Sequence, residues 1–115
     1  MNFDFSKQIG KKIAVCEKTR TTLIGIDTIT HLICDCYVTT LYHTDQEPIS
    51  SSKLLKHFEV ELNEFGFLRV NNNTIINPNH ISGIEFSCQR KILHINHSEI
   101  KVSRRRAYLF KKFQK

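Results

Sequence analysis

Glycine is scarce in this 115-residue chain, and long apolar runs are absent. The four glycines lie far apart, so the chain lacks a Gly-rich loop that could cradle the phosphates of a nucleotide. No apolar stretch approaches the length of a membrane span, and residues 1–15 contain no apolar core of signal-peptide length. Neither a membrane protein nor an exported one is therefore expected, and we predict a cytoplasmic location.

Cysteine is present, but its spacing does not indicate a disulfide framework or a metal site. In a cytoplasmic protein the four cysteines are expected to stay reduced and to pack as small apolar side chains. Cys34 and Cys36, with His31 nearby, are too close together for a structural zinc site, which usually separates paired ligands by about two to four residues. The other histidines supply no second pair. We predict no metal and no cofactor, and the absence of a convergent catalytic pattern argues against an enzyme.

Acidic residues are missing from the C-terminal end, and this makes the charge very uneven. Residues 1–100 carry ten Lys or Arg against eleven Asp or Glu, whereas residues 101–115 carry seven basic residues and no acidic one. The net charge of +6 therefore resides in the last segment. Such a cationic block favours a polyanion, most often nucleic acid or an acidic membrane surface, although a solvated basic tail is the alternative.

The length fits one domain with its own hydrophobic core, and the residue pattern predicts mostly strands. Alternating polar and apolar residues predict strands over residues 12–16, 21–26, 29–34, 37–43, 68–70, 81–88, 91–96 and 100–102. Turns are expected at residues 27–28, 35–36, 89–90 and 96–98, with a loop over residues 44–48. We assign residues 1–11 to a leader or linker remnant and residues 12–115 to the domain.

One central helix is predicted between the serines at positions 50–52, which offer N-caps, and Gly66, which offers a stop. Leu54, Leu55, Phe58 and Leu62 recur there at helical spacing. Its mixed charges indicate a scaffold helix rather than a recognition helix, which should be basic. A short C-terminal helix is expected over residues 104–113, so the fold class is mainly β with one central and one terminal helix.

Two groups of residues are able to recognise nucleic acid. An Asn amide can bond N6 and N7 of adenine, and an Arg guanidinium can bond O6 and N7 of guanine, so Asn71, Asn72 and Asn73 together with residues 104–106 could read a major groove. Asn also favours tight turns, and from the residues alone both readings of the Asn run stay open. Arg69 has two readings as well, a phosphate contact or an ion pair with a glutamate of the predicted helix. Asn77 is expected to hold the backbone before Pro78.

These segments resemble the LytTR family of bacterial DNA-binding domains. A helix with the pattern Leu54-Leu55-x-x-Phe58-x-x-x-Leu62 precedes Phe67 or Leu68, Arg69, Asn71, Asn73, Ile76 and Asn77, which fit the family's Phe-x-Arg-x-His-x-Ser-x-x-Val-Asn segment. Val102, Ser103, Arg104 and Arg105 fit its Val-Ser-Arg-Arg segment. The resemblance spans residues 13–113. It implies an elongated, predominantly antiparallel sheet fold that presents loops, not a helix, to DNA.

The resemblance also implies roles for particular residues. Asn72 and Arg105 would read bases, Arg104 and Arg106 would pair with phosphates, and Ser103 would either cap the terminal helix or donate to a phosphate. Lys101 and Lys111 would add attraction that does not depend on sequence. The turn before residue 38 corresponds to a third DNA-facing loop, in which Cys36 takes the contact position. Because a thiol reads bases poorly, backbone groups or Tyr37 would substitute for it.

The function implied is sequence-specific binding of double-stranded DNA that regulates bacterial transcription, with two copies bound to paired direct repeats. Since the family's domain generally follows a receiver domain or a membrane segment, we expect either a free-standing regulator or the C-terminal output domain of a two-component response regulator. A receiver domain or sensor protein is then a further partner. Two other readings stay open: a small β-rich binder of RNA or single strands, and a protein-interaction module that pairs through a sheet edge.

Overall fold

The computed structural model of the chain describes residues 6–44, 47–87 and 90–113. Its strands are β1 (Lys12–Cys16), β2 (Thr21–Gly25), β3 (Ile29–Asp35), β4 (Val38–His43), β5 (Ile49–Ser51), β6 (Leu68–Asn71), β7 (Thr74–Ile76), β8 (Ile81–Phe86), β9 (Lys91–Ile95) and β10 (Ser98–Val102). Its helical elements are the α-helix α1 (Leu55–Asn63) and the 3₁₀ segments η1 (Ser6–Gln8), η2 (Ile26–Thr28), η3 (Pro78–His80) and η4 (Arg104–Phe113). None of the described helices is long and apolar enough to cross a membrane.

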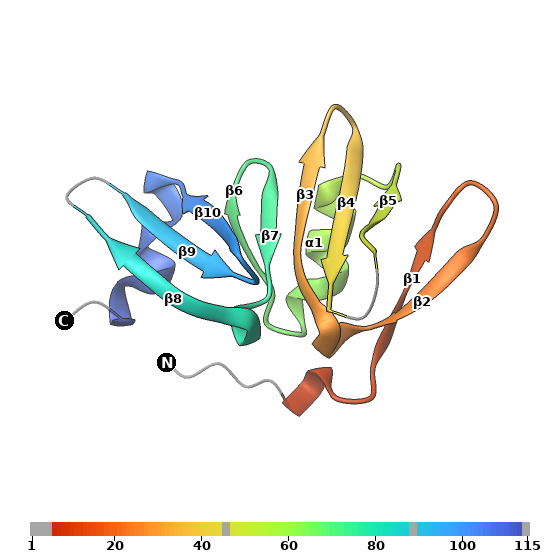
Figure 1. Cartoon of the computed structure of the whole chain (residues 1–115), viewed down its shortest axis with the longest axis horizontal. Helices are drawn as coiled ribbons and strands as arrows, with labels where there is room; N and C mark the ends of the chain where they lie inside the picture. Colours follow the sequence, from red (N-terminus) through yellow and green to blue (C-terminus); the bar gives the residue numbers. More distant parts are fainter. Residues whose placement is uncertain (1–5, 45–46, 88–89, 114–115) are drawn as a thin grey trace.

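The strands form three antiparallel sheets that follow one another along the long axis of the molecule (Figure 1). A five-stranded sheet with the order β5-β4-β3-β7-β6 occupies the centre, flanked by the β1–β2 hairpin and by the β10-β9-β8 sheet. The molecule measures 47 × 32 × 24 Å. The predicted fold, mainly β, antiparallel and elongated with one central helix and one C-terminal helix, is therefore confirmed.

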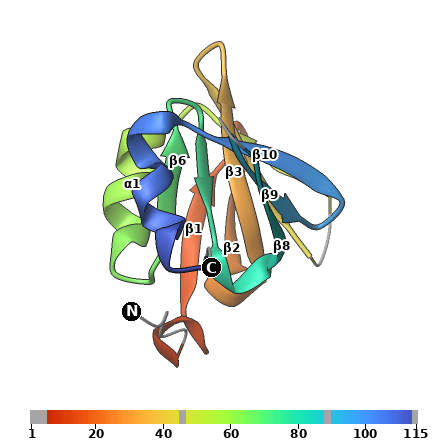
Figure 2. The same ribbon diagram turned by 90° about the vertical axis from the view of Figure 1, so that its left-hand side faces the viewer.

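Two apolar clusters hold the sheets together. The first lies where α1 covers the central sheet, and it buries Phe58 and Leu62 of the helix completely. The second lies between the β10-β9-β8 sheet and β6–β7, and Phe110 of η4 is fully buried in it. Burial of a Phe side chain stabilises a fold by about 1.5 to 3 kcal/mol. Phe58 therefore anchors α1 to the sheets, and Phe110 anchors η4. In Figure 2, α1 and η4 lie on the same side of the molecule.

Both ends of α1 follow from local chemistry. Gly66 stops the helical turn after α1 in a left-handed conformation, with φ of 86°, and its N–H donates to Asn63 O, as the sequence predicts. The serine N-cap prediction is wrong. Leu54 takes the N-cap position, and no side chain bonds to the helix there. Ser51 is not available as a cap, because it lies in β5, where it pairs with Thr39 of β4, and its Oγ accepts the N–H of Lys53.

Other departures concern strands too short for a periodic pattern. The sequence does not predict β5 or β7, each of three residues, and β7 is buried throughout, so it shows no alternation of polar and apolar positions. The turn expected at residues 35–36 lies at residues 36–37, and β10 begins at Ser98 rather than at residue 100. Residues 45–46 of the predicted loop and Cys88 and Gln89 of the predicted β8–β9 hairpin lie outside the described residues.

The segment before β1 is tied into the packed structure through Gln8. This side chain is fully buried, and it exchanges two amide hydrogen bonds with Asn77, of 3.0 and 3.1 Å. Asn77 also donates to Ile29 O and accepts the N–H of Asn79, which confirms its predicted role of holding the backbone around Pro78. The domain boundary at residue 11 stays a prediction, but Gln8 is part of the core network.

We expect Gln8→Ala to lower the free energy of unfolding by about 1 to 3 kcal/mol, because it leaves the buried Asn77 amide without two of its partners. Urea denaturation measures the loss. The neighbouring Lys7→Ala is a matched control, since Lys7 is exposed and its loss should cost less than about 0.5 kcal/mol. Equal stability of the two variants would contradict a structural role for the amide pair.

His31 is a buried core residue of β3, with only 2% of its surface exposed. Its ring stacks on Tyr42 at a centroid distance of 4.4 Å, and its Nδ1 lies 2.9 Å from Thr30 Oγ1. Burial disfavours the imidazolium and lowers the pKa of His31 from 6.5 to about 4. The folded protein therefore holds this ring neutral at pH values where an unfolded chain would protonate it.

We expect the domain to lose stability as the pH falls from 6.5 towards 4, because in that window only the unfolded chain binds a proton at His31. The difference between the two pKa values corresponds to at most about 3 kcal/mol at the acidic end. Urea denaturation at several pH values measures the slope, which His31→Phe should reduce. His57→Gln, a change at an exposed position, should leave the slope as it is. An unchanged slope in His31→Phe would contradict this origin.

Candidate nucleic-acid interface

Several hairpin turns lie along one long edge of the molecule, which we call the hairpin edge (Figures 1 and 2). It comprises the turns of β1–β2 (residues 17–20), β3–β4 (residues 36–37) and β6–β7 (residues 72–73). Arg90 and Ser103, the residue that joins β10 to η4, line one hollow with the β6–β7 turn and so belong to this edge as well. Antiparallel hairpins place successive turns at alternate ends, so these turns share one end of the strands, whereas the β9–β10 turn (residues 96–97) lies at the other end.

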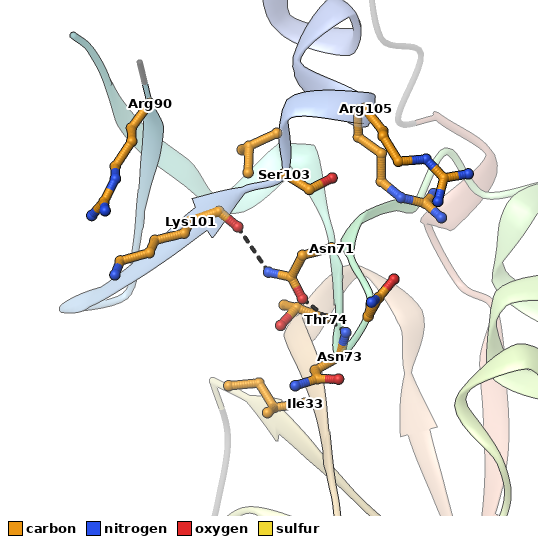
Figure 3. A pocket seen from close by; sticks show the side chains of 11 residues that line it. Ile33, Asn71, Asn73, Thr74, Arg90, Lys101, Ser103 and Arg105 are labelled. Carbon is orange, nitrogen blue, oxygen red and sulfur yellow. Dashed lines mark hydrogen bonds between the residues drawn. The ribbon is translucent and has the colours of Figure 1, made fainter. Parts of the chain in front are cut away.

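The Asn run and the C-terminal arginines meet in one hollow on this edge, which we call the Asn–Arg hollow (Figure 3). Its volume is about 640 Å³. Most of the predicted site residues line it, namely Asn71, Asn72, Asn73, Lys101, Ser103, Arg105 and Arg106, together with Thr74, Val102, Ile33 and Arg90. Asn72 and Arg105, the two predicted base readers, are thus on the same side of the molecule, and both are exposed.

Asn71 differs from the other two asparagines because its side chain is bonded inside the protein. Its Nδ2 donates to Lys101 O at 2.8 Å, and its Oδ1 accepts the N–H of Asn73 at 2.8 Å (Figure 3). The first bond joins β6 to β10, which belong to different sheets. The geometry makes Asn71 a residue that positions the turn, and leaves the side chains of Asn72 and Asn73 exposed in front of it.

Arg69 is half-buried and supports the same turn from behind. Its guanidinium pairs with Glu59 at 3.0 Å and donates to Asn72 O at 2.6 Å and, at 3.4 Å, to Asn71 O. The predicted alternative of a structural ion pair is therefore confirmed, with Glu59 as the partner. A direct phosphate contact by Arg69 stays a prediction, since the guanidinium now has an internal role in shaping the turn.

The three consecutive arginines differ in burial and in their contacts. Arg106 is half-buried, and its Nη1 donates to Arg69 O at 3.2 Å, so it joins η4 to β6. Arg105 is exposed in the Asn–Arg hollow, whereas Arg104 is exposed without lining that hollow. Ser103 holds the junction through its backbone, with its N–H on Val70 O at 2.9 Å. Its hydroxyl lies in the hollow (Figure 3), and its two predicted roles stay predictions.

The β3–β4 turn projects from the edge beside the Asn–Arg hollow. Cys36 and Tyr37 both have positive φ, 48° and 68°, as a two-residue hairpin turn of the right twist requires. Non-glycine residues adopt this conformation at some cost in free energy. Tyr37 is 83% exposed, and hydrogen bonding to Asp35 raises the pKa of the Cys36 thiol, which favours its neutral form. The turn thus presents an aromatic ring and no thiolate.

Arg90 is a member of the hollow that the sequence does not single out. It is the second residue of the predicted β8–β9 turn, and its sequence neighbours give no signal of a site. It reaches the hollow because β9 pairs with β10, so that the start of β9 lies beside the end of β10, where Ser103 follows. A search for basic residues at turns would have found it, but only the strand pairing shows which turns converge.

One group of side chains in the described part of the chain has atoms suited to a metal ion. Glu85, His94 and Glu99 lie on neighbouring strands of the β10-β9-β8 sheet, with their ligand atoms within 4.8 Å of one another. His94 Nε2 and Glu85 Oε1 are 2.6 Å apart and already satisfy each other as a hydrogen-bonded pair. Exposed carboxylates gather in this way without an ion, so the prediction of no metal is left as a prediction.

The geometry is that of a β-rich binding domain, which presents polar turns and exposed arginines along one edge. The model of the LytTr DNA-binding domain family matches residues 19–115. The chain therefore belongs to the LytTr family of DNA-binding domains. Among solved structures it is similar to the LytTr DNA-binding domain of a Bacillus cereus protein described as a methyl-accepting/DNA response regulator, with a TM-score of 0.74 and 21% identity over 90% of this chain and 96% of that one. No curated protein matches the sequence.

We expect Asn71→Ala and Asn72→Ala to have different effects, because Asn71 holds the β6–β7 turn in place whereas the side chain of Asn72 is exposed on that turn. Asn71→Ala removes the bonds to Lys101 O and Asn73 N, so it should cost about 1 kcal/mol in stability and speed the hydrogen exchange of the Asn73 amide. Asn72→Ala, at an exposed position one residue away, should change stability by less than about 0.5 kcal/mol. Equal exchange rates for the Asn73 amide in wild type and Asn71→Ala would contradict the assignment.

Proposed function

We propose that this domain binds double-stranded DNA in a sequence-specific manner, through loops in the major groove, and regulates transcription in a bacterium. The observation that carries the proposal is the convergence of Asn72 and Arg105, two exposed side chains from distant segments, in one hollow lined by basic residues. Membership of the LytTr family supports the DNA-binding part. The major groove is about 12 Å wide, which is enough to admit the β6–β7 turn at the end of two strands of the central sheet.

The exposed side chains that line the Asn–Arg hollow contact the bases. Asn72 offers its amide to the N6 and N7 atoms of adenine, and Arg105 offers its guanidinium to the O6 and N7 atoms of guanine. Asn73 lies next to Asn72 on the same exposed turn and contributes a second amide. Tyr37 reaches the duplex from the β3–β4 turn, with the Cys36 backbone beside it. The duplex bends so that both Asn72 and Arg105 reach base pairs, and the free-energy cost of this bend depends on the DNA sequence.

Affinity comes mainly from the phosphate backbone. Arg104 and Lys101 are exposed on or beside the hollow, and Lys111 is exposed further along η4. Each phosphate that such a side chain neutralises releases a counterion, which makes binding stronger at low salt and independent of base sequence. Because nothing acidic follows Glu99, this part of the surface does not repel the duplex.

The internal bonds of the site reduce the cost of docking. Asn71, Arg69 and Arg106 hold the β6–β7 turn and the β10–η4 junction in place before any DNA arrives. A recognition loop that is already ordered loses less conformational entropy on binding, and its side chains meet the groove in a defined register. These residues therefore act on affinity through the shape of the site.

We infer the biological setting from the resemblance to the family. Two copies of the domain bind paired direct repeats, and a receiver domain or a sensor protein delivers the signal, as in a two-component response regulator. The protein acts in the cytoplasm, without a cofactor and without catalysis. The alternative of an RNA or single-strand binder needs several exposed aromatic rings on the binding surface, and the described residues of the hairpin edge carry one, that of Tyr37. The other candidate rings are buried, at Phe58 and Phe67, or half-buried, at Phe65 and Phe86. A single exposed ring beside the Asn and Arg side chains favours the duplex as the ligand.

Arg105→Ala is expected to relax discrimination at one base pair by about 1 to 3 kcal/mol, because the bidentate contact to guanine is lost. The measurement compares affinity for duplexes selected from a random pool with affinity for their single-base variants. Equal losses on selected and random DNA would refute a reading role for Arg105.

Lys111→Ala serves as the control for that experiment. A side chain that contacts only phosphates should weaken binding to all duplexes alike and reduce the salt dependence by about one unit of slope. Gel-shift titrations of duplex DNA, single-stranded DNA and RNA complete the test. Preference for either single-stranded ligand would replace the proposed function by the alternative.

A further inference from the structure

The hairpin edge continues beyond the β3–β4 turn to the β1–β2 hairpin, which carries none of the predicted site residues (Figure 1). A second hollow, of about 570 Å³, lies between the tip of this hairpin and the strands β4 and β5. Lys18, Thr19, Ser50 and Ser52 line it, with Val38 next to the turn of the β3–β4 hairpin. We call it the Lys–Ser hollow. The β3–β4 turn therefore has a hollow on each side.

The chemistry of the Lys–Ser hollow suits a phosphodiester. Lys18 is exposed and has no ion pair among the described residues. Ser50 and Ser52 are exposed and bring hydroxyl donors, whereas Ser51 between them is buried, and its Oγ accepts the N–H of Lys53. One ammonium group with neighbouring hydroxyls is a donor set typical of contacts to the DNA backbone, and it carries no base-reading amide or guanidinium.

The one carboxylate at this tip is compensated. Glu17 accepts a hydrogen bond from Thr22 at 2.9 Å and from Arg20 at 3.2 Å. Together these bonds lower the pKa of Glu17, Thr22 contributing most, so the carboxylate stays ionised and keeps its partners. The pairing neutralises Glu17 with Arg20 and holds the turn in shape. The charge that remains at the tip is that of Lys18.

The shape of the molecule lets one duplex pass both hollows. The tips of β1–β2, β3–β4 and β6–β7 lie on the same edge, and this edge runs along the 47 Å axis. That length corresponds to about 14 base pairs at a rise of about 3.4 Å. A straight or gently bent duplex that fills the Asn–Arg hollow therefore extends past the β3–β4 turn towards the β1–β2 tip.

We propose that the β1–β2 turn, together with Ser50 and Ser52, holds the sugar-phosphate backbone of the same duplex, beyond the base pairs that Asn72 and Arg105 read. This inference rests on the proposed function and extends the contacted DNA at one end. The family model matches residues 19–115 and so leaves out β1, half of the hairpin that carries the contact. The contact adds affinity without sequence preference, and only on a duplex long enough to reach it.

The test uses fluorescence anisotropy on the whole chain with a selected duplex in two lengths, one ending at the last base pair that selection enriches and one extended by a random flank. Wild type should bind the extended duplex more tightly, and Lys18→Glu should remove most of that gain. Affinity falls as the salt rises from about 50 to 200 mM, and each phosphate contact contributes about 3.5-fold to this fall, since it adds about 0.9 to the slope of log affinity against log salt. Lys18→Ala, which removes one such contact, should therefore show a fall that is about 3.5-fold smaller than that of wild type.

Lys7→Glu is the matched control, because Lys7 is exposed, the charge change is the same, and η1 lies at the end of the molecule away from the hairpin turns (Figure 1). It should keep the full gain from the flank. If wild type and Lys18→Glu gain equally from the flank while Arg105→Ala loses specificity as expected, the contact at the β1–β2 turn is overturned and the proposed function stands. If wild type binds no duplex, or Arg105→Ala shows no loss of specificity, the proposed function fails with it.

Discussion

The architecture of the site depends on hydrogen bonds that join two sheets which share no strand ladder. Asn71 Nδ2 on Lys101 O, Ser103 N–H on Val70 O and Arg106 Nη1 on Arg69 O connect β6 of the central sheet to the end of β10 and the start of η4. Without them the Asn turn and the arginine segment would belong to independent layers. Because the second apolar cluster, with Phe110 at its centre, packs beneath the same junction, the bonds and the burial support each other.

This arrangement divides residues of one type into two classes by their environment. Among the arginines, Arg69 and Arg106 are half-buried and bonded to backbone carbonyls, whereas Arg104 and Arg105 are exposed. The asparagines divide in the same way, since Asn71 is bonded internally and its two successors are exposed. A buried donor that lost its acceptor would incur a desolvation penalty, so the internal members are constrained by the fold. The exposed members are free to meet a ligand.

Prediction from the sequence succeeded where the signal is local and long enough to repeat. The α1 pattern, the strands of five or more residues and the basic C-terminal segment fall in this group. It failed for β5 and β7, because three residues show no period, and for the serine caps, because Ser51 is drawn into a strand by its pairing with Thr39. It also treated Gln8 as part of a leader, since nothing in the sequence near residue 8 reveals that Asn77 is its partner.

The sequence by itself determined which residues are able to recognise nucleic acid, through the donor geometry of Asn and Arg, and where the excess charge lies. Its resemblance to a known family added an elongated fold that presents loops to DNA and the roles expected of particular residues. Only the tertiary structure decided which of those side chains are available, because availability depends on partners distant in sequence: Glu59 for Arg69, Lys101 for Asn71 and the backbone of β6 for Arg106. It also brought Arg90 and Lys18 to the hairpin edge, since strand pairing, a non-local interaction, decides which turns lie together.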